Sequence, residues 1–375
     1  MRILIVSVTT GYGHHSTAAA LAEEFRARGD EVVIEDLYEY CSTFMYNAMD
    51  KGYLFSTRHM KRQFAQAYNQ LEKNASLRRL AGAISGNPLL CKKFAQFFHG
   101  YSPDIIIATH VFAAQVLNEL KLQRLITAPL FGIVTDYCIH PFWEDLDAVD
   151  YIVTASELLS YTAVRRGIAE KRILPFGLPV RPQFLIARSR EEACNELGIE
   201  QRPTVLIMGG SMGYGNMTET VHAALDCSID ELQVICICGN NSRLAEELGR
   251  VSHPRLSVHG FVNNVELFMD AADCIITKPG GLTVTELLVK QLPAILVNPI
   301  PGHEERNAEF LLNNGGAVRI SPSFSAGEAL HFIFSTPGRL ELMRRSLALI
   351  AHPDAARRLC SFSAELVSSG SVQKA

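Results

Sequence analysis

The sequence predicts an α/β protein built from two Rossmann-like domains, each a parallel sheet covered by helices. Short apolar strands alternate with helical segments along most of the 375 residues, a pattern typical of parallel sheets with crossover helices. A strand that runs into a glycine-rich loop opens the chain at ILIVSVTTGYGHHS and occurs again at PTVLIMGGSMG. Between the two series lies LPFGLPVRPQF, and its three prolines suit an extended connector better than a core element.

The first domain is expected over residues 1–178 and the second over 179–336, followed by a helical tail over 337–375. The tail has no strand partner and is expected to pack back across both domains. Ligands of such sheets bind beyond the carboxyl ends of the strands, so the glycine loops of both domains are expected to face a shared cleft. The expected strands, in chain order, are RILIVSV, EVVIEDL, DIIIAT, PLFGIVTD and DYIVTA, then PTVLIM, LQVICICG, RLSVHGF, CIITKPGG and PAILVNPI.

Composition narrows the class of protein. A formal net charge of −4 argues against general nucleic-acid binding. Nine cysteines without regular spacing indicate a reducing compartment rather than a disulfide framework. No apolar run approaches the roughly 20 residues of a membrane-spanning helix, and MRILIVSV is too short for a signal peptide and is interpreted as a strand. A cytoplasmic protein is therefore expected.

TKPGGLTVTELL is the stretch most typical of a nucleotide site. Gly280 and Gly281 follow a strand, and a helix is expected to begin at about Leu282. Glycines let backbone amides approach an anion, and a helix start favours a phosphate. Glu286, about one turn later, could accept hydrogen bonds from ribose hydroxyls. The alternative is a plain strand–turn–helix junction.

Other glycine-rich and acidic stretches exclude competing chemistries. GYGHHS and GGSMGYG lack the third glycine of a dinucleotide fingerprint, which disfavours a nicotinamide cofactor, and no P-loop is present. DLD at 145–147 lies in a polar stretch rather than at a strand end, which disfavours a metal site. NPIPGHEERNAEFL places donors and acceptors after a strand, where they could bind sugar hydroxyls or simply cap a helix.

Four of these stretches resemble one family. TKPGGLTVTE, NPIPGHEERNAEFL, VTDYCIHPFW and GLPVRPQF are similar to the diacylglycerol glycosyltransferases. This family comprises the bacterial processive diacylglycerol β-glucosyltransferases and the plant monogalactosyldiacylglycerol synthases, distant relatives of MurG. The resemblance implies the GT-B fold, with two Rossmann-like domains and the donor held mainly by the C-terminal one. It also implies inverting transfer of a hexose from a UDP-sugar to a lipid hydroxyl without a bound metal or other cofactor.

The resemblance also implies a donor site, residue by residue. Within that site the common family residue at the position of His303 is glutamine, so the histidine bears on the choice of donor sugar. The diphosphate is expected to contact Gly280, Gly281, Leu282 and Thr283, and its phosphate side Gly210 and Ser211. The ribose is expected to contact Glu286, and the uracil Phe261 and Val262. The sugar is expected to contact His303, Glu304 and Asn307, and Gly13 is expected on the donor side of the N-terminal loop.

The family's G-x-G-H motif matches residues 11–14 and makes His14 the candidate general base. Inverting transfer needs one group to accept the proton of the attacking hydroxyl, and a neutral imidazole suits this near pH 7. The positive field of a helix start is expected to lower the pKa of His14. Asp136 is the candidate carboxylate that orients the ring and stabilises the imidazolium, and His140 and Trp143 are expected to border the acceptor. The alternative for His14 is a capping or packing role, and His15 is expected not to be catalytic.

Residues 51–100 predict a membrane-facing surface. They carry nine Lys or Arg against one acid, Glu72, a local net charge of +8, with aromatic residues interleaved. A basic, aromatic helical region of this kind is typical of an interface with anionic lipid, although a solvated helix face over an aromatic core stripe is the alternative. The basic residues expected to take part are Arg58, Lys61, Arg62, Arg78, Arg79, Lys92 and Lys93.

Taken together, these patterns predict a UDP-sugar-dependent hexosyltransferase that makes β-glycosyl diacylglycerol at the cytoplasmic membrane face. UDP-glucose is expected ahead of UDP-galactose, with an anionic membrane surface as partner and no nucleic acid. Three alternatives remain open at this point: a MurG-like transferase to a polyprenyl-linked acceptor, a UDP-sugar epimerase on the same fold, and a UDP-sugar-sensing regulatory protein.

Overall fold

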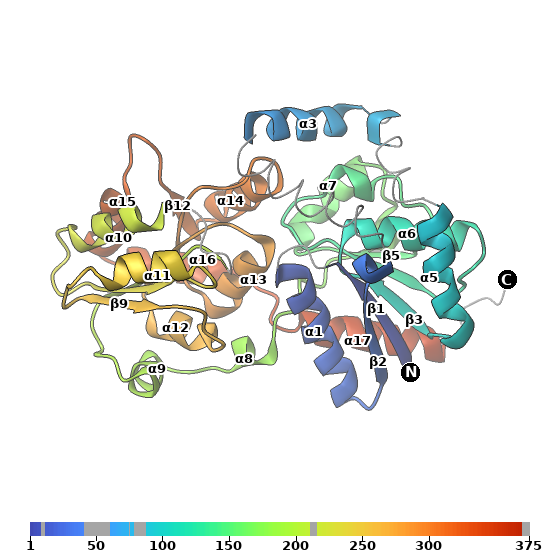
Figure 1. Cartoon of the computed structure of the whole chain (residues 1–375), viewed down its shortest axis with the longest axis horizontal. Coiled ribbons are helices and arrows are strands. Elements are labelled where there is room, and N and C mark those ends of the chain that lie inside the picture. The colour runs from blue at the N-terminus through green and yellow to red at the C-terminus, as the bar shows by residue number, and fades with distance from the viewer. Residues whose placement is uncertain (9–11, 41–60, 75, 79–87, 211–215, 370–375) are drawn as a thin grey trace. The chain divides into compact units, whose positions relative to one another are not determined.

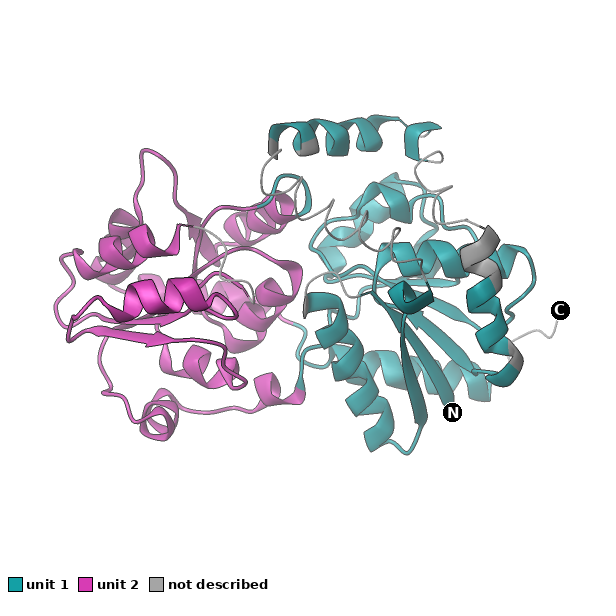
Figure 2. Ribbon diagram, viewed as in Figure 1, with its two compact units in different colours: residues 1–181, 300–303, 352–375 teal, residues 182–299, 304–351 magenta. Residues whose placement is uncertain are grey.

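A computed structural model of the protein describes residues 1–8, 12–40, 61–74, 76–78, 88–210 and 216–369. The chain divides into two compact units, coloured separately in Figure 2. The connection between them passes from unit 1 to unit 2 after Arg181. Unit 1 comprises Met1–Arg181, Ile300–His303 and His352–Ala375, and unit 2 comprises Pro182–Pro299 and Glu304–Ala351.

A six-stranded parallel sheet forms the centre of unit 1, in the order β2-β1-β3-β4-β5-β6 (Figure 1). Each residue from Ile3 to Val6 is fully buried, as expected for a strand covered on both faces. The five predicted strands are confirmed; the sixth, β6, is too short for a sequence pattern to reveal. The strands are β1 (Arg2–Ser7), β2 (Glu31–Asp36), β3 (Ile105–Ala108), β4 (Leu130–Ile133), β5 (Tyr151–Val153) and β6 (Ile173–Leu174).

Unit 2 repeats this architecture with a second six-stranded parallel sheet, in the order β12-β11-β10-β7-β8-β9. The five strands predicted for this half are confirmed, and the short β12 was not predicted. The strands are β7 (Thr204–Met208), β8 (Gln233–Ile237), β9 (Leu256–His259), β10 (Cys274–Thr277), β11 (Ala294–Leu296) and β12 (Ala317–Arg319).

Helices cover both sheets. In unit 1 the chain moves outward from β1 to β2 and in the opposite direction from β3 to β4, so right-handed crossovers place α1 and α6 on opposite faces. The helical segments of unit 1 are α1 (Tyr12–Ala27), η1 (Leu37–Tyr40), α3 (Lys61–Lys73), α5 (Pro88–Gly100), α6 (Val111–Leu122), η2 (Pro141–Trp143), η3 (Glu157–Leu159), α7 (Ser160–Arg165), η4 (Glu170–Arg172) and α17 (Ala355–Ser368).

The core of unit 2 lies between its sheet and the helices that follow each strand, with Val205, Val234 and Cys236 among its fully buried residues. The helices of unit 2 are α8 (Pro182–Leu185), α9 (Arg190–Leu197), α10 (Met217–Leu225), α11 (Ser242–Gly249), α12 (Val265–Ala271), α13 (Gly281–Lys290), α14 (His303–Asn313, whose first residue is grouped with unit 1), α15 (Ala326–Ser335) and α16 (Arg339–Leu349).

The connector is extended as predicted: residues 175–181 form neither helix nor strand, and Pro182 begins α8. The stretch predicted as a helical tail contains two helices that belong to different units, α16 in unit 2 and α17 in unit 1. Gly177 marks where α17 approaches the connector. Its φ is +89°, and a Cβ there would lie 2.3 Å from Cβ of His352, so a glycine is required on both counts.

Candidate active site

Each sheet reverses its strand order at one place. The reversal falls between β1 and β3 in unit 1 and between β7 and β10 in unit 2. Loops that leave neighbouring strands in opposite directions open a crevice at their carboxyl ends, where ligands of this fold class bind. The predicted residues Gly13 and His14 follow β1, and Gly280 and Gly281 follow β10. The sequence motifs therefore lie at the two places where the topology provides a binding site.

His14 lies in the first turn of α1, and its imidazole is held by the backbone that follows β3. Its Nδ1 is 2.8 Å from the carbonyl oxygen of Thr109, and the hydroxyl oxygen of Thr135 lies 3.2 Å from the same nitrogen. A carbonyl oxygen can only accept, so Nδ1 carries the hydrogen and Nε2 keeps its lone pair when the ring is neutral. This is the tautomer that a base acting through Nε2 requires.

The surroundings of His14 keep it neutral. Burial is the largest influence and lowers its pKa, whereas the hydrogen bond to Thr109 and the negative charge of Asp136 raise it, and His303 and His15 lower it. The pKa of His14 is therefore lowered, as predicted. The main cause is the removal of water by burial, whereas the positive field of the helix start was the cause expected from the sequence. The orienting contact expected from Asp136 is made at Nδ1 by the Thr109 carbonyl, and Asp136 acts on the ring through its charge.

His140 and Trp143 follow β4 but differ in what they touch. His140 accepts a hydrogen bond from the amide of Phe142 at Nδ1 (3.2 Å), and its ring packs edge-on against Tyr68 with centroids 5.2 Å apart. Burial lowers the pKa of His140 to about 3. Trp143 is 3% exposed and packs on Gly132 in β4, where a Cβ would lie 2.4 Å from the indole ring. Trp143 is thus packed into the core beside β4, and its predicted place at the border of the acceptor stays a prediction.

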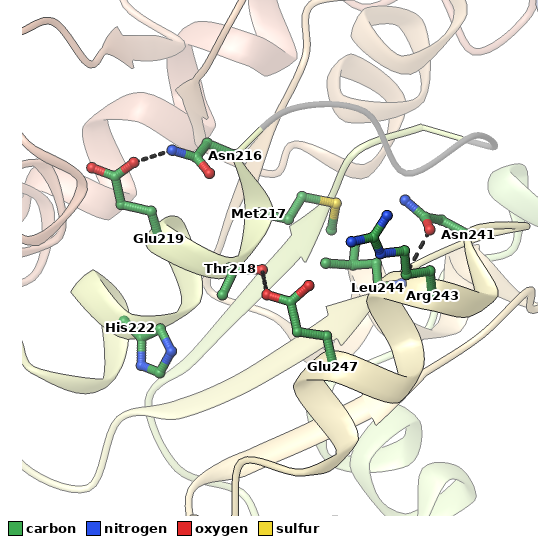
Figure 3. Close-up of a pocket in the computed structure, with 9 residues that line it drawn as sticks. All are labelled: Asn216, Met217, Thr218, Glu219, His222, Asn241, Arg243, Leu244 and Glu247. Carbon is green, nitrogen blue, oxygen red and sulfur yellow. Dashed lines mark hydrogen bonds between the residues drawn. The ribbon is translucent and has the colours of Figure 1, made fainter.

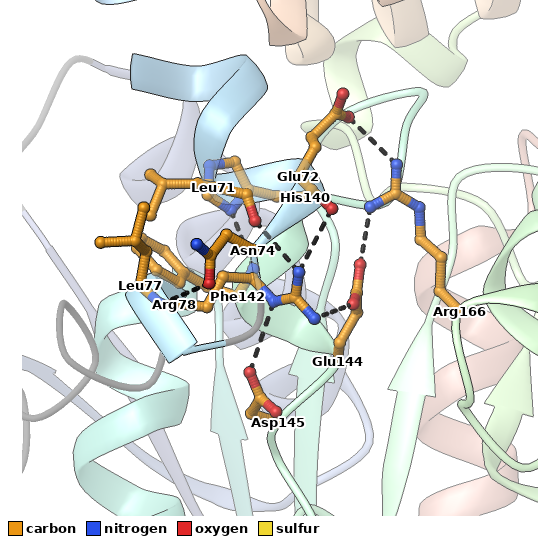
Figure 4. Close-up of polar contacts among 10 residues, drawn as sticks. All are labelled: Leu71, Glu72, Asn74, Leu77, Arg78, His140, Phe142, Glu144, Asp145 and Arg166. Carbon is orange, nitrogen blue, oxygen red and sulfur yellow. Dashed lines mark hydrogen bonds and ion pairs between the residues drawn. The ribbon is translucent and has the colours of Figure 1, made fainter.

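Arg78 does not belong to the predicted basic membrane surface. Its guanidinium is buried: Nη1 donates to the carbonyls of Leu71 and Glu72, Nη2 lies 2.6 Å from Glu144, and Nε lies 3.5 Å from Asp145 (Figure 4). A cation surrounded in this way is not available to lipid headgroups. The pairing also gives Asp145, part of the DLD stretch, a structural role.

The rest of the predicted basic region is only partly described. Arg62 in α3 and Lys93 in α5 are exposed. Lys61 and Lys92 belong to the same two helices, but the structure does not describe their side chains. Arg58 and Arg79 lie outside the described residues. Two of the interleaved aromatic residues, Tyr68 and Phe94, are buried, which favours the core-stripe interpretation for them.

In unit 2 the start of α13 is a candidate anion site. The helix begins at Gly281, its N-cap Gly280 has no side chain, and a Cβ at Gly280 would meet nothing closer than the Thr283 hydroxyl at 3.9 Å. The amides of Gly281, Leu282 and Thr283 have no acceptor within the helix, because the first turn never does. These amides and the helix dipole suit a phosphate group.

The other predicted donor residues surround the same end of the sheet. Glu286 is buried in α13, and Gly210 follows β7 with a φ of +74°. Phe261, 53% exposed, and the partly buried Val262 follow β9. Ser211 lies outside the described residues.

Two contacts stabilise the loop before α13. Glu304 is buried and lies 3.0 Å from Lys278, the residue that precedes the Pro-Gly-Gly turn. Asn307 is fully buried and donates a hydrogen bond from Nδ2 to the Pro279 carbonyl (3.0 Å). Asn307 therefore holds the loop before α13, and its predicted contact with the sugar stays a prediction. His303 is grouped with unit 1, where its charge lowers the pKa of His14.

A pocket of about 500 Å³ lies elsewhere in unit 2, between the starts of α10 and α11 (Figure 3). Its walls carry polar side chains that bond to one another, such as Thr218 to Glu247 at 2.8 Å and Asn216 to Glu219. None of the predicted site residues lines it.

Sequence reasoning missed three residues of the site: Thr109, His110 and Lys278. Thr109 and His110 directly follow the predicted strand DIIIAT, so the rule that sites lie at strand ends could have indicated them. Lys278 stands inside the quoted motif TKPGG, and its position before a glycine turn and a helix start was the available signal. No sequence pattern, however, reveals that the Thr109 carbonyl faces His14.

Comparison with known proteins agrees with this geometry. Residues 14–180 match the family model of monogalactosyldiacylglycerol (MGDG) synthase, and residues 204–331 match that of the glycosyltransferase family 28 C-terminal domain. The chain is similar over 97% of its length to the solved structure of MurG from Acinetobacter baumannii, covering 99% of that chain with a TM-score of 0.62 and 18% identity. It is also similar to Anabaena Alr3699/HepE solved with UDP-glucose, with a TM-score of 0.55 and 15% identity over 98% and 100% of the two chains.

Two successive Rossmann-like units of this kind define the GT-B fold of glycosyltransferases. The probable monogalactosyldiacylglycerol synthase of Nicotiana tabacum is 31% identical, over 98% of this chain and 71% of that protein. The processive diacylglycerol beta-glucosyltransferase of Bacillus cytotoxicus is 27% identical, over 96% and 92% of the two chains. The chain belongs to the diacylglycerol glycosyltransferase family, which includes these two proteins. In the part of the chain that the structure describes, no helix is long and apolar enough to cross a membrane.

Proposed function

We propose that this protein transfers a hexose, with inversion, from a UDP-sugar to the hydroxyl of diacylglycerol. The observation that carries the proposal is the imidazole of His14: its tautomer leaves Nε2 able to accept a proton, at the strand reversal of the unit that matches the MGDG synthase model. The named relatives are diacylglycerol glucosyltransferases and galactosyldiacylglycerol synthases. Glucose is proposed ahead of galactose as the sugar.

In the proposed reaction, His14 Nε2 removes the proton of the diacylglycerol hydroxyl as its oxygen attacks the anomeric carbon. The bond from that carbon to the diphosphate oxygen breaks, and UDP leaves with the electron pair. Attack from the face opposite the leaving group inverts the anomeric centre and gives a β-glycoside from an α-linked donor. The imidazolium that forms is stabilised by the charge of Asp136, which raises the pKa of His14.

On the donor side, the amides at the start of α13 would receive the diphosphate, Glu286 the ribose, and Phe261 with Val262 the uracil. Lys278, which pairs with Glu304 at 3.0 Å, precedes this helix start by three residues. We propose that the amides and the dipole of the helix start stabilise the leaving diphosphate and that transfer therefore requires no bound metal. Glu304, oriented by Lys278, is the proposed contact to the sugar.

Because the proposed acceptor is a membrane lipid, the protein is proposed to act as a peripheral protein on an anionic membrane surface. Exposed Arg62 and Lys93 support this role, each worth on the order of 1 kcal/mol near such a surface. Arg78 does not contribute to it, because its charge is used inside unit 1.

The test is UDP release by the purified protein on vesicles of phosphatidylcholine and phosphatidylglycerol, with and without diacylglycerol. UDP-glucose, UDP-galactose and UDP-N-acetylglucosamine are compared, each with and without EDTA, and the lipid products are analysed. Release that depends on diacylglycerol, survives EDTA and yields a glycosyl diacylglycerol is the expected result. Vesicles lacking phosphatidylglycerol should bind less protein in the same series.

A negative result in each part of this experiment would contradict a different part of the proposal. If no donor gave release that depends on diacylglycerol, the acceptor would be wrong. Loss of activity in EDTA, restored by a divalent cation, would contradict metal-independent transfer. Equal sedimentation with neutral and anionic vesicles would contradict the membrane-surface proposal.

A further inference from the structure

We propose that His110 is a positioning residue for the base: its ring fixes the orientation of His14 and so keeps Nδ1 on the Thr109 carbonyl that sets the tautomer. The proposal rests on the function proposed for His14, and it adds a residue that the sequence motifs did not indicate. Three contacts carry it, all within unit 1 and all at the strand ends beside the reversal between β1 and β3.

The first contact fixes His110 itself. His110 is the N-cap of α6, with extended backbone (φ −139°, ψ 142°), and its Nδ1 accepts a hydrogen bond from the amide of Phe112 at 3.1 Å. An amide N–H only donates, so Nδ1 of His110 carries the lone pair and Nε2 the hydrogen of the neutral ring. The cap thereby sets both the rotamer and the tautomer of this imidazole.

The second contact joins the two imidazoles. The rings of His14 and His110 meet edge to face, with centroids 4.5 Å apart and planes at 85°. Such a contact restricts rotation of the His14 ring about its side-chain bonds. Rotation in either direction would make the His14 ring clash with the His110 ring or would leave a gap between the two. Burial holds the pKa of His110 well below its usual value, so His110 stays neutral beside the base.

The third contact connects this ring pair to the sheet. Thr109, the residue before His110, donates its amide to Val6 (3.0 Å) and its hydroxyl to Ser7 (3.0 Å). Its carbonyl is therefore fixed by β1 on one side and by the capped start of α6 on the other. Two consecutive residues then confine His14, with Thr109 at Nδ1 and His110 against the ring.

The test uses a pair of substitutions that separate capping from ring contact. In His110→Asn the amide oxygen can still cap α6, since asparagine is among the best N-caps, but the ring is lost. In His110→Phe the aromatic edge remains and the cap acceptor is lost. Both variants are compared with the native chain for kcat, for KM of the UDP-sugar, for melting temperature and for the pH dependence of kcat.

His110→Asn is expected to lower kcat about 10- to 100-fold, as a misplaced reacting group does, with KM for the donor and melting temperature nearly unchanged. Water admitted beside His14 raises its pKa, so the acid limb of the kcat profile moves to higher pH. The charged and titratable groups facing His14 are His15, Asp136 and His303, and all three remain in place. His110→Phe is expected to lower the melting temperature and to leave the acid limb where it was.

Nitrogen NMR of histidine-labelled protein gives a reading that requires neither donor nor acceptor. The native His14 should show hydrogen at Nδ1, and His110→Asn should mix the two tautomers and raise the pKa of His14. The proposal would be overturned if His110→Asn kept the native kcat, tautomer and pH profile. It would also be overturned if kcat fell in both variants only in proportion to the fall in their melting temperatures. Absence of diacylglycerol-dependent release by the native chain would instead contradict the proposed function, because the NMR reading stands by itself.

Discussion

Three histidines at the strand ends of unit 1 all bond to the backbone through Nδ1, but they differ in whether that nitrogen accepts or donates. Nδ1 of His110 and of His140 accepts from a backbone amide, whereas Nδ1 of His14 donates to a carbonyl. The free nitrogen of His14 is therefore an acceptor, and those of the other two rings carry hydrogen. The same residue type thus has different chemistry according to the backbone group that it meets.

His14→Ala is predicted to reduce transfer about 10²- to 10⁴-fold, the usual contribution of a general base, while UDP binding by calorimetry stays nearly unchanged. In the native enzyme the base is active when neutral, and its pKa is lowered from 6.5. Activity should therefore persist as pH falls to 6.5 and be lost only as pH falls through the lowered pKa. Loss of UDP binding in His14→Ala, or a loss of kcat centred above pH 6.5, would contradict the assigned role.

At the scale of elements, a ring of alternating charges attaches α3 to the segments that follow β4 and β5. Arg78 pairs with Glu144 at 2.6 Å, Glu144 with Arg166 at 2.7 Å, and Arg166 with Glu72 at 3.0 Å, and the Glu72 carbonyl accepts from Arg78 (Figure 4). The ring holds α3 in place, and α3 carries Tyr68, whose ring contacts His140. Arg78, which was expected at a membrane surface, thus helps to hold α3 and Tyr68 beside His140.

Glu144→Gln is predicted to lower the free energy of unfolding by about 3 kcal/mol, because it leaves Arg78 and Arg166 mostly buried without their shared partner. Glu341→Gln in α16 is the matched control: its partner Arg345 lies 2.7 Å away, but the side chains are 56% and 75% exposed. That exposed pair should contribute less than about 1 kcal/mol. Urea titrations measure both, and equal losses in the two variants would contradict the role of the charge ring.

At the scale of the whole molecule, the C-terminal segment returns to the unit in which the chain began. Leu359 and Cys360 of α17 are fully buried, and Phe362 meets Tyr151 and Phe176 with ring centroids 5.0 and 5.7 Å apart. Arg28 of unit 1 also donates to the Ser361 hydroxyl at 3.1 Å. Residues near 360 are therefore part of the core that supports His14, although they lie more than 300 positions away.

Leu359→Ala is predicted to destabilise unit 1 by about 2–5 kcal/mol, the cost of removing a buried leucine side chain. Hydrogen exchange should quicken in the strands of unit 1 and remain unchanged in those of unit 2. Leu349→Ala, at a position 86% exposed in α16, should change stability by no more than about 0.5 kcal/mol. Faster exchange in unit 2 alone after Leu359→Ala would contradict this assignment of α17.

Much of the site was predictable because its motifs are local. A glycine loop between a strand and a helix is a short-range pattern, so the placement of His14 after β1 and of Gly280 and Gly281 before α13 followed from adjacent residues. The contacts of Arg78, Trp143 and Asn307 were not predictable from local patterns. Each depends on a partner that the fold brings close, and these partners are Glu144, Gly132 and Pro279 respectively. Composition does not indicate whether a charge is paired inside or exposed to solvent.

The sequence alone determined that the chain forms two parallel α/β halves, and its motifs placed it in a family of glycosyltransferases. Apolar periodicity and turn residues act between near neighbours in the chain. The sequence alone is therefore enough to predict the helices, strands and turns that they form. Only the tertiary structure decided that a carbonyl of Thr109 orients His14, that His110 packs against it, and that Arg78 of the basic segment is paired with Glu144 inside unit 1. These outcomes depend on which distant groups share the limited interior, where each buried polar atom needs a partner.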